Sequence, residues 1–282
     1  MILEHEIPKG ARLYFGKSAR QKRELESVLS EMLLKSGFEE IVTPNFSYGQ
    51  HQSIDDVKKL IKIFDEDNNE VALRADSTLD VVRIITKRLG RTTNHKKWFY
   101  VQPVFNYPSN EHYQVGCEWI GHDDISDIMA ISLDIVKLLK IEATLQISNI
   151  NIPKIISDEF EIDIELFKNS DIAALYDLGI EWLNKLIEIN SKDDITENVL
   201  NIMPVRIKEE LQKLKNIAMF LMYDEIVISP LYYGSMKYYD DIYYRVVEGN
   251  STLMIGGSYK SEEIDSLGFA LYTDNVLKIL DK

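Results

Sequence analysis

A change of pattern at residue 153 limits which folds this chain can adopt. From there to residue 223, hydrophobic residues recur at helical spacing almost throughout, with breaks at Gly179 and Pro204. On both sides, short runs rich in β-branched and aromatic residues predict strands. We therefore expect three segments: a strand-rich core from 1 to 152, a helical insert from 153 to 223, and a second part of the core from 224 to 282.

The predicted strands are joined by short loops as often as by helices. "FEEIVTP" predicts a short strand that ends at Pro44, and "KWFYVQPVF" and "HYQVGCEWIG" predict two strands with a loop between them. "DEIVISP", "DIYYRVVEG" and "STLMIGG" predict three more, while residues 18–36 and about 124–140 predict amphipathic helices. Short connections favour antiparallel pairing, so we expect an α+β fold with a mainly antiparallel sheet flanked by helices.

The charge and the cysteine content exclude some partners and compartments. The formal net charge is −14, which argues against nucleic acid because phosphate binding depends on Lys and Arg. Residues 17–23 and 87–97 are locally basic, a pattern typical of solvated surface. The single cysteine, Cys117, excludes an internal disulfide framework and fits a reducing cytoplasm. No stretch of roughly eighteen apolar residues is present, so we expect a cytoplasmic protein that does not span a membrane.

One predicted strand carries two polar residues suited to a ligand. Gln114 and Glu118 are four residues apart, so they share a face of the strand, and Gly116 between them leaves that face open. A carboxylate there could hold an ammonium or imidazole group, and the amide can both donate and accept hydrogen bonds. An exposed sheet face with polar residues accounts for the same pattern, so both interpretations stay open.

Further candidates lie elsewhere in the chain. Asp76 follows a predicted strand and would suit an amine, although a helix N-cap accounts for it equally. The four tyrosines of "YYDDIYY" would divide between two strand faces, so that one pair lines a pocket or merely packs in the core. The five histidines show no metal-ligand spacing, and no phosphate-binding glycine loop is present. We therefore expect no metal, no cofactor and no catalytic group.

The order of these motifs resembles that of the class II histidyl-tRNA synthetases. "FEEIVTP" resembles the first motif of that family, "PVFNYPSNEHYQVGCEWIG" the second and "LGFALYTDNVLKIL" the third, and the resemblance covers nearly the whole chain. It implies a class II aminoacyl-tRNA synthetase-like core that self-associates as a dimer, with Pro44 at the dimer interface. It also implies a histidine pocket lined by Asp76, Gln114, Glu118, Tyr238 and Tyr239.

Three positions depart from the synthetase pattern at an arginine. Asn106 stands where a second-motif arginine binds the ATP α-phosphate, Asn275 where a third-motif arginine binds the γ-phosphate, and Gly234 where a further arginine assists amino-acid activation. Adenylation needs fixed positive charge, which arginine supplies by bidentate donation. We therefore do not expect aminoacylation. The chain stops shortly after the third motif, so we also expect no anticodon-binding domain and no tRNA recognition.

The resemblance narrows to the synthetase-like regulatory subunits of ATP phosphoribosyltransferase. It implies a non-catalytic partner of the short-form catalytic subunit, a glycosyltransferase that performs the first step of histidine biosynthesis. It further implies activation of that subunit, histidine feedback inhibition and a hetero-octamer of four plus four subunits. A minimal class II amino-acid ligase and a stand-alone histidine sensor remain alternatives. Whether the pocket residues still bind histidine or only support the fold also stays open.

Overall fold

The computed structural model describes residues 6–48, 57–234, 238–261 and 263–281. The chain divides into two compact units, one made of residues 1–122 with 261–282 and the other of residues 123–260. The boundaries of the three predicted segments remain a prediction. Among the described residues, none of the helices is long and apolar enough to cross a membrane.

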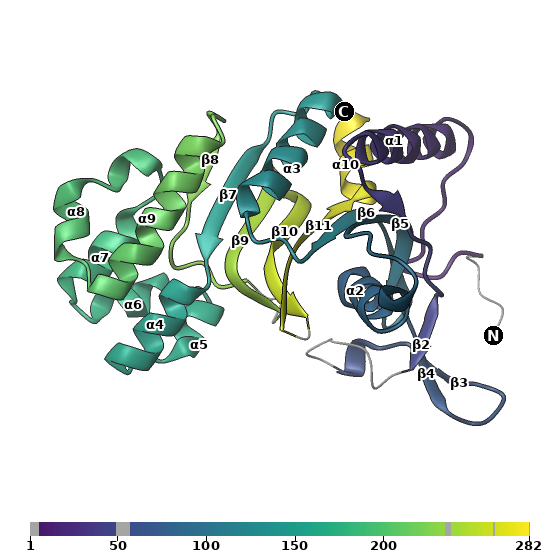
Figure 1. Cartoon of the computed structure of the whole chain (residues 1–282), viewed down its shortest axis with the longest axis horizontal. Coiled ribbons are helices and arrows are strands. Elements are labelled where there is room, and N and C mark those ends of the chain that lie inside the picture. Colours follow the sequence, from purple (N-terminus) through teal and green to yellow (C-terminus); the bar gives the residue numbers. More distant parts are fainter. Residues whose placement is uncertain (1–5, 49–56, 235–237, 262, 282) are drawn as a thin grey trace. The chain divides into compact units, whose positions relative to one another are not determined.

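The first unit contains strands in the order β1-β5-β6-β11 and a small sheet in the order β2-β4-β3. Helices α1 and α10 lie on one side of β5 and β6, and α2 lies on the other (Figure 1). The bounds of its strands are β1 (Glu39–Glu40), β2 (Phe46–Tyr48), β3 (Lys62–Phe64), β4 (Glu70–Leu73), β5 (Lys97–Asn106), β6 (Asn110–Ile120) and β11 (Ile264–Tyr272). Its helices are α1 (Gly16–Lys35), α2 (Ser77–Lys87) and α10 (Thr273–Leu280), with 3-10 turns at Val57–Lys59 and Leu89–Arg91.

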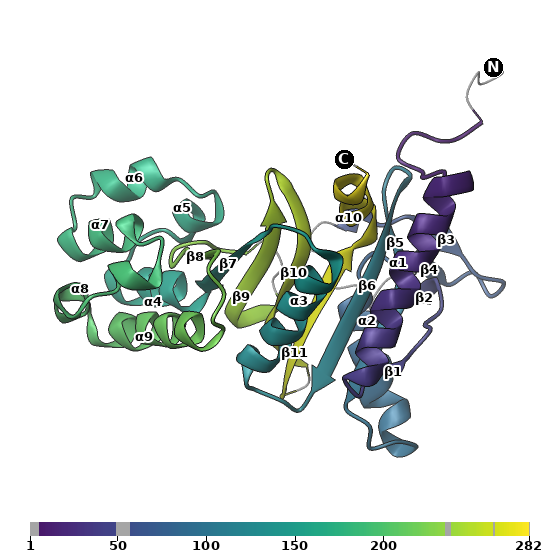
Figure 2. The same cartoon turned by 90° about the horizontal axis from the view of Figure 1, so that it is seen from above.

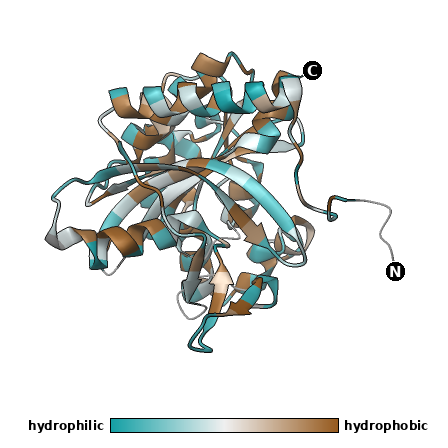
Figure 3. Cartoon of the chain, turned by 90° about the vertical axis from the view of Figure 1, so that its right-hand side faces the viewer, coloured by the Kyte–Doolittle hydropathy of each residue, from teal (hydrophilic) through white to brown (hydrophobic). Residues whose placement is uncertain are grey.

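Helix α1 confirms the amphipathic helix predicted for residues 18–36. Its buried positions include Leu25, Leu29 and Leu33, four residues apart, and four residues are about one helical turn. Figure 3 shows hydrophilic and hydrophobic residues alternating along this helix, which lies at the top of that view. The buried stripe packs towards β5, so the hydrophobic periodicity alone located this element.

The strand predicted for "FEEIVTP" is shorter than expected. Only Glu39–Glu40 pairs with β5, in parallel, and the Ile41 amide extends the pairing by one hydrogen bond of 2.8 Å to the Phe99 carbonyl. The carbonyls of Thr43 and Pro44 instead accept hydrogen bonds from Arg74 Nη1, at 3.1 and 3.0 Å. The chain therefore leaves the sheet before Pro44, whose place at a dimer interface stays a prediction.

Arg74 is the residue that fixes this turn. Its side chain is 0% exposed, and its Nε and Nη2 also donate to the Pro103 carbonyl at 3.0 and 2.7 Å. A further partner is Asn45 Oδ1, at 3.0 Å from Nη2. The planar guanidinium thus ties the segment after β1 to strand β5 through several donors at once, which lysine could not do.

The second unit contains strands in the order β10-β9-β7-β8. Helices α4 to α9 gather beyond β7 and β8, at the left of Figures 1 and 2. The bounds of its strands are β7 (Thr144–Asn149), β8 (Ile226–Ile228), β9 (Tyr239–Glu248) and β10 (Ser251–Ser261). The bounds of its helices are α3 (Ile125–Leu139), α4 (Asn151–Phe160), α5 (Ile164–Lys168), α6 (Ile172–Asp177), α7 (Glu181–Glu188), α8 (Glu197–Ile202) and α9 (Val205–Phe220), with a 3-10 turn at Lys192–Asp194.

The strand pairing confirms the predicted fold class. The pairs β5–β6, β6–β11, β7–β9 and β9–β10 are antiparallel, while β1–β5 and β7–β8 are parallel. Each unit has helices packed on its strands. The fold is therefore α+β with a mainly antiparallel sheet flanked by helices.

Candidate functional site

The candidate pocket residues of strand β6 share one face with their neighbours on β5 and β11. Gln114 lies opposite Gln102 on β5 and opposite Tyr272 on β11. Directly paired residues of antiparallel strands point to the same face, so these three side chains lie in one row. Helix α2 packs against both β6 and β11 in this unit. The row therefore lies in the interior of the unit.

Both polar residues of β6 are buried. Glu118 is 0% exposed and Gln114 is 9% exposed, so the alternative of an exposed polar sheet face is wrong. Tyr100 Oη donates to Glu118 Oε1 at 3.3 Å, and the same hydroxyl lies 3.3 Å from Thr78 Oγ1 on α2. Both distances are long for hydrogen bonds between oxygen atoms. A buried carboxylate in such surroundings is suited to a shorter, charge-assisted bond from a cationic ligand.

Two glycines make room for the side chains of this face. A Cβ on Gly116 would lie 2.4 Å from Cζ of Tyr100 and 2.8 Å from the Phe269 carbonyl. A Cβ on Gly268 would lie 2.0 Å from Oε2 of Glu118. The room that Gly116 leaves is thus taken by the Tyr100 ring, and the position of the Glu118 carboxylate depends on glycine at 268.

Asp76, directly before α2, lies near the same row of residues. Burial, with a smaller contribution from the charge of Asp76, raises the pKa of Tyr272 to about 12. Tyr272 is the residue paired with Gln114 across β11 and β6. Three of the predicted pocket residues, Asp76, Gln114 and Glu118, therefore lie on adjoining elements of the first unit.

Two further polar groups beside these residues have no hydrogen-bond partner among the residues that the structure describes. Gln102 is 5% exposed; its Oε1 accepts from Thr43 Oγ1 at 3.0 Å, whereas its Nε2 has no partner there. The hydroxyl of Ser77, the first residue of α2, is also buried and unpartnered. Such atoms are rare in folded proteins, so we regard both as candidate ligand contacts. The sequence analysis missed them, although the hairpin register that pairs Gln102 with Gln114 could have indicated the first.

The four tyrosines of the second unit divide between two faces, as the alternation of strand β9 predicted. The ring of Tyr239 lies 5.2 Å from that of Tyr243 and 4.6 Å from that of Tyr238. Tyr244 points to the other face, where its hydroxyl lies 2.7 Å from Ser132 Oγ on α3. Tyr238 and Tyr239 belong to the second unit, so their membership of one pocket with Asp76, Gln114 and Glu118 stays a prediction.

The three positions without the synthetase arginines have separate surroundings. Asn106 ends β5 and pairs with Asn110 across the hairpin. Asn275 lies in α10, directly after Asp274, whose Oδ2 accepts a 3.2 Å hydrogen bond from the Tyr113 amide. Gly234 is buried in the second unit, where a Cβ would lie 3.2 Å from the ring of Tyr243. An arginine at 234 would therefore require the Tyr243 ring to move.

Metal and thiol chemistry find no support in the part of the chain that the structure describes. Within it, no group of three or more His, Cys, Asp or Glu side chains could hold a metal ion. Cys117 is buried, and burial raises the pKa of its thiol well above the ordinary value. A buried, protonated thiol is a poor nucleophile. The features of the site are thus one buried carboxylate, two amides and a hydroxyl.

Comparison with known proteins gives this arrangement a family. The family model described as Histidyl-tRNA synthetase matches residues 11–276. The ATP phosphoribosyltransferase regulatory subunit of Wolinella succinogenes is 44% identical over 278 residues, which cover 99% of this chain and 96% of that protein. The chain belongs to the ATP phosphoribosyltransferase regulatory subunit family. The regulatory subunit of Helicobacter hepaticus is 40% identical, with 99% of both chains covered.

A solved structure of the same description has the same fold. The ATP phosphoribosyltransferase regulatory subunit/histidyl-tRNA synthetase of Bacillus halodurans aligns with a TM-score of 0.86 and 18% identity, covering 100% of this chain and 85% of that one. The family resemblance indicated by the ordered motifs is confirmed, and with it the class II synthetase-like fold.

Proposed function

We propose that this chain is a non-catalytic regulatory subunit of ATP phosphoribosyltransferase. The observation that carries the proposal is the 44% identity, over nearly the full length of both chains, to a protein of that name. The chain would assemble with the short-form catalytic subunit, activate the first step of histidine biosynthesis and take part in feedback inhibition by histidine. The assembly we propose is a hetero-octamer of four plus four subunits, in which the regulatory chains associate as dimers.

The absence of aminoacylation is supported by the three replaced arginines. Asn106 and Asn275 are uncharged, and Gly234 has no side chain. A transferring phosphoryl group is stabilised by fixed positive charge, and none of these residues supplies it. The crowding of Gly234 against Tyr243 indicates that the second unit has packed around the smaller residue.

Histidine recognition is supported by the chemistry of the buried row. The Glu118 carboxylate suits an ammonium or imidazolium group, and Gln114 can donate and accept. The unpartnered Gln102 Nε2 and Ser77 Oγ would suit the carboxylate of an amino acid, since both can donate a hydrogen bond. A ligand that engages these last two groups would satisfy polar atoms for which the described residues offer no partner.

Co-elution with the catalytic subunit tests this proposal. The chain is mixed with the short-form ATP phosphoribosyltransferase of the same organism and passed through size-exclusion chromatography with light scattering. We expect one complex whose mass equals four copies of each chain. Separate elution of the two proteins at micromolar concentration would overturn the proposal and favour the stand-alone histidine sensor.

A further inference from the structure

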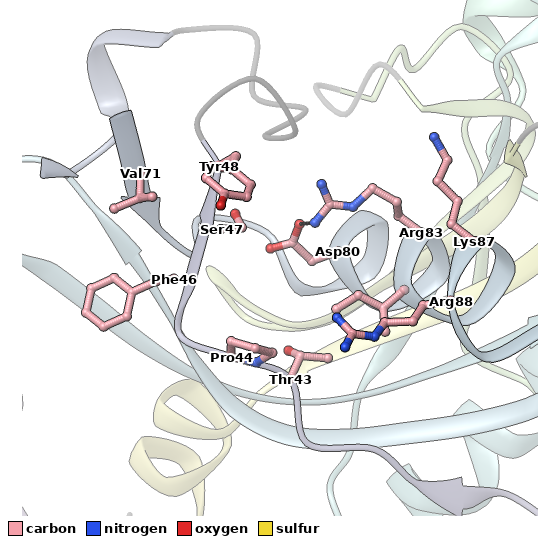
Figure 4. Close-up of a pocket in the computed structure, with 11 residues that line it drawn as sticks. Thr43, Pro44, Phe46, Ser47, Tyr48, Val71, Asp80, Arg83, Lys87 and Arg88 are labelled. Carbon is pink, nitrogen blue, oxygen red and sulfur yellow. Dashed lines mark hydrogen bonds and ion pairs between the residues drawn. The ribbon is translucent and has the colours of Figure 1, made fainter. Parts of the chain in front are cut away.

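A cavity of about 520 Å³ lies elsewhere in the first unit, between the segment of residues 43–48 and helix α2. Figure 4 shows the two walls facing each other, with Thr43, Pro44, Ser47 and Tyr48 on one side and the helix on the other. None of the pocket residues Asp76, Gln114 or Glu118 lines it. The cavity is lined by Thr43, Pro44, Phe46, Ser47, Tyr48, Val71, Asp80, Arg83, Ile84, Lys87 and Arg88.

The helical wall presents one face of α2 and the residue just after it. The lining positions 80, 83, 84, 87 and 88 recur at intervals of three and four, the spacing of a single helix face. Val81 and Val82 are 0% exposed and Ile85 is 4% exposed, so the opposite face is packed into the unit. Packing of the apolar face therefore fixes which side chains of α2 meet the cavity.

This helix face is strongly basic. It brings Arg83, Lys87 and Arg88 to the cavity together with one carboxylate, Asp80. Arg83 Nη2 donates to Asp80 Oδ1 at 2.8 Å, which orients the guanidinium and neutralises one of the three cations. In Figure 4 the guanidinium of Arg88 is directed towards Thr43 and Pro44, across the cavity. The lining thus has a formal charge of +2 in a chain whose net charge is −14.

The opposite wall is held in place from behind. The carbonyls of Thr43 and Pro44 accept hydrogen bonds from Nη1 of the fully buried Arg74. A wall fixed in this way loses little conformational freedom when a ligand arrives, which favours binding. Tyr48 and Val71, from the small sheet, add an aromatic and an apolar surface to the same cavity.

We propose that this cavity binds a small organic phosphate. Arginine and lysine are the side chains that pair best with phosphate oxygens. A volume of about 520 Å³ falls within the range of small-molecule sites in proteins. The apolar surface beside Tyr48 would receive the organic part of such a ligand, while Lys87 and Arg88 receive the phosphate. The proposal does not depend on the regulatory function proposed above.

A basic helix face also arises in proteins where no ligand binds. Cations in the last turn of a helix are favoured by its dipole, and exposed basic residues are commonly only solvated. A second copy of the chain would equally cover the cavity, because Pro44 belongs to the motif expected at a dimer interface. In each of these three cases phosphate has no specific effect, so a binding experiment separates them from the proposal.

The test titrates the full chain with inorganic phosphate, uridine 5′-monophosphate and uridine, each followed by calorimetry at low ionic strength. We expect the monophosphate to bind with a Kd of about 1 mM or tighter, phosphate alone to bind more weakly, and uridine to show no binding. Binding of the monophosphate should weaken as salt is added, because the cations at the rim are exposed.

Variants locate the binding on α2. We expect the double variant Lys87→Gln/Arg88→Gln to bind the monophosphate about tenfold more weakly or worse. The matched control is Arg206→Gln, an exposed arginine of the second unit that pairs with Glu159; it should bind like the wild type. Thermal unfolding of each variant verifies that the fold is intact.

Three results would overturn the proposal. The first is no saturable binding of the monophosphate by the folded wild-type chain. The second is equal binding by the wild type and by the double variant. The third is a double variant that changes the monomer–dimer equilibrium while the wild type ignores phosphate, which would assign the basic face to contact between copies.

Discussion

Gly268 lies directly opposite Glu118 across strands β11 and β6, so close that a Cβ at 268 would stand 2.0 Å from the carboxylate Oε2. The same Cβ would also lie 2.7 Å from the Cys117 carbonyl. Because backbone atoms contribute to this crowding, it cannot be relieved by moving the Glu118 side chain alone. Glycine at this position therefore allows the carboxylate to occupy the buried row.

The variant Gly268→Ala should both destabilise the chain and displace Glu118. We expect the free energy of unfolding to fall by about 1–3 kcal/mol, the usual cost of overpacking a core. Urea denaturation measures it. The matched control is Gly90→Ala, whose Cβ would contact only the Ile85 carbonyl at 3.4 Å and should change stability by less than about 0.5 kcal/mol. Equal stability of Gly268→Ala and the wild type would show that the carboxylate does not depend on glycine here.

Glu118→Gln tests the role of the carboxylate with almost no change in shape. If Glu118 binds histidine, loss of its charge removes a charge-assisted hydrogen bond worth about 1.5–3 kcal/mol, so affinity should fall about tenfold or more. Histidine inhibition of the assembled complex, supported by calorimetry on the chain alone, measures it. The control is Glu66→Gln, on the exposed loop between β3 and β4. Unchanged inhibition in an intact complex would rule out a ligand role for Glu118.

Tyr272 gives the fold a dependence on alkaline pH. Its pKa is raised from 10.0 to about 12 by burial and by Asp76, so the folded chain keeps a proton that the unfolded chain releases. The corresponding stability is fully present below about pH 10 and is lost as the pH rises towards 12, on the order of 2 kcal/mol. The free energy of unfolding should fall less steeply over this range in Tyr272→Phe than in the wild type. Parallel pH curves would contradict the assignment.

Much of the fold could be predicted because it depends on periodicity. The alternation along β6 placed Gln114 and Glu118 on one face, and helical spacing located α1 and α3. Strands of two or three residues, such as β1, β2 and β3, offer too few positions for a pattern. The length of "FEEIVTP" was overestimated for another reason, because the chain leaves the sheet to meet Arg74, a residue about thirty positions later.

The candidate site could be predicted less completely because its details depend on strand register. Nothing local in the sequence says that Gly268 faces Glu118, or that Gln102 lies beside Gln114. The burial of Glu118 likewise requires α2, which is distant along the chain, to cover the sheet. Residue types indicated the chemistry, and tertiary packing determined which groups are buried together.

The chain should not activate an amino acid. We expect no histidine-dependent exchange of pyrophosphate into ATP above the background without enzyme, because uncharged residues stand at 106, 234 and 275. An active histidyl-tRNA synthetase serves as the positive control under the same conditions. Exchange that depends on histidine and on this chain would favour the amino-acid ligase instead.

The regulatory function itself is tested best by the rate of the catalytic subunit. The short-form ATP phosphoribosyltransferase of the same organism is assayed alone, with this chain added in equal amount, and with chain and histidine together. We predict a low rate alone, stimulation of roughly tenfold or more that saturates near one chain per catalytic subunit, and reversal of the stimulation by histidine. An unchanged rate at saturating concentrations of the folded chain would contradict a regulatory role.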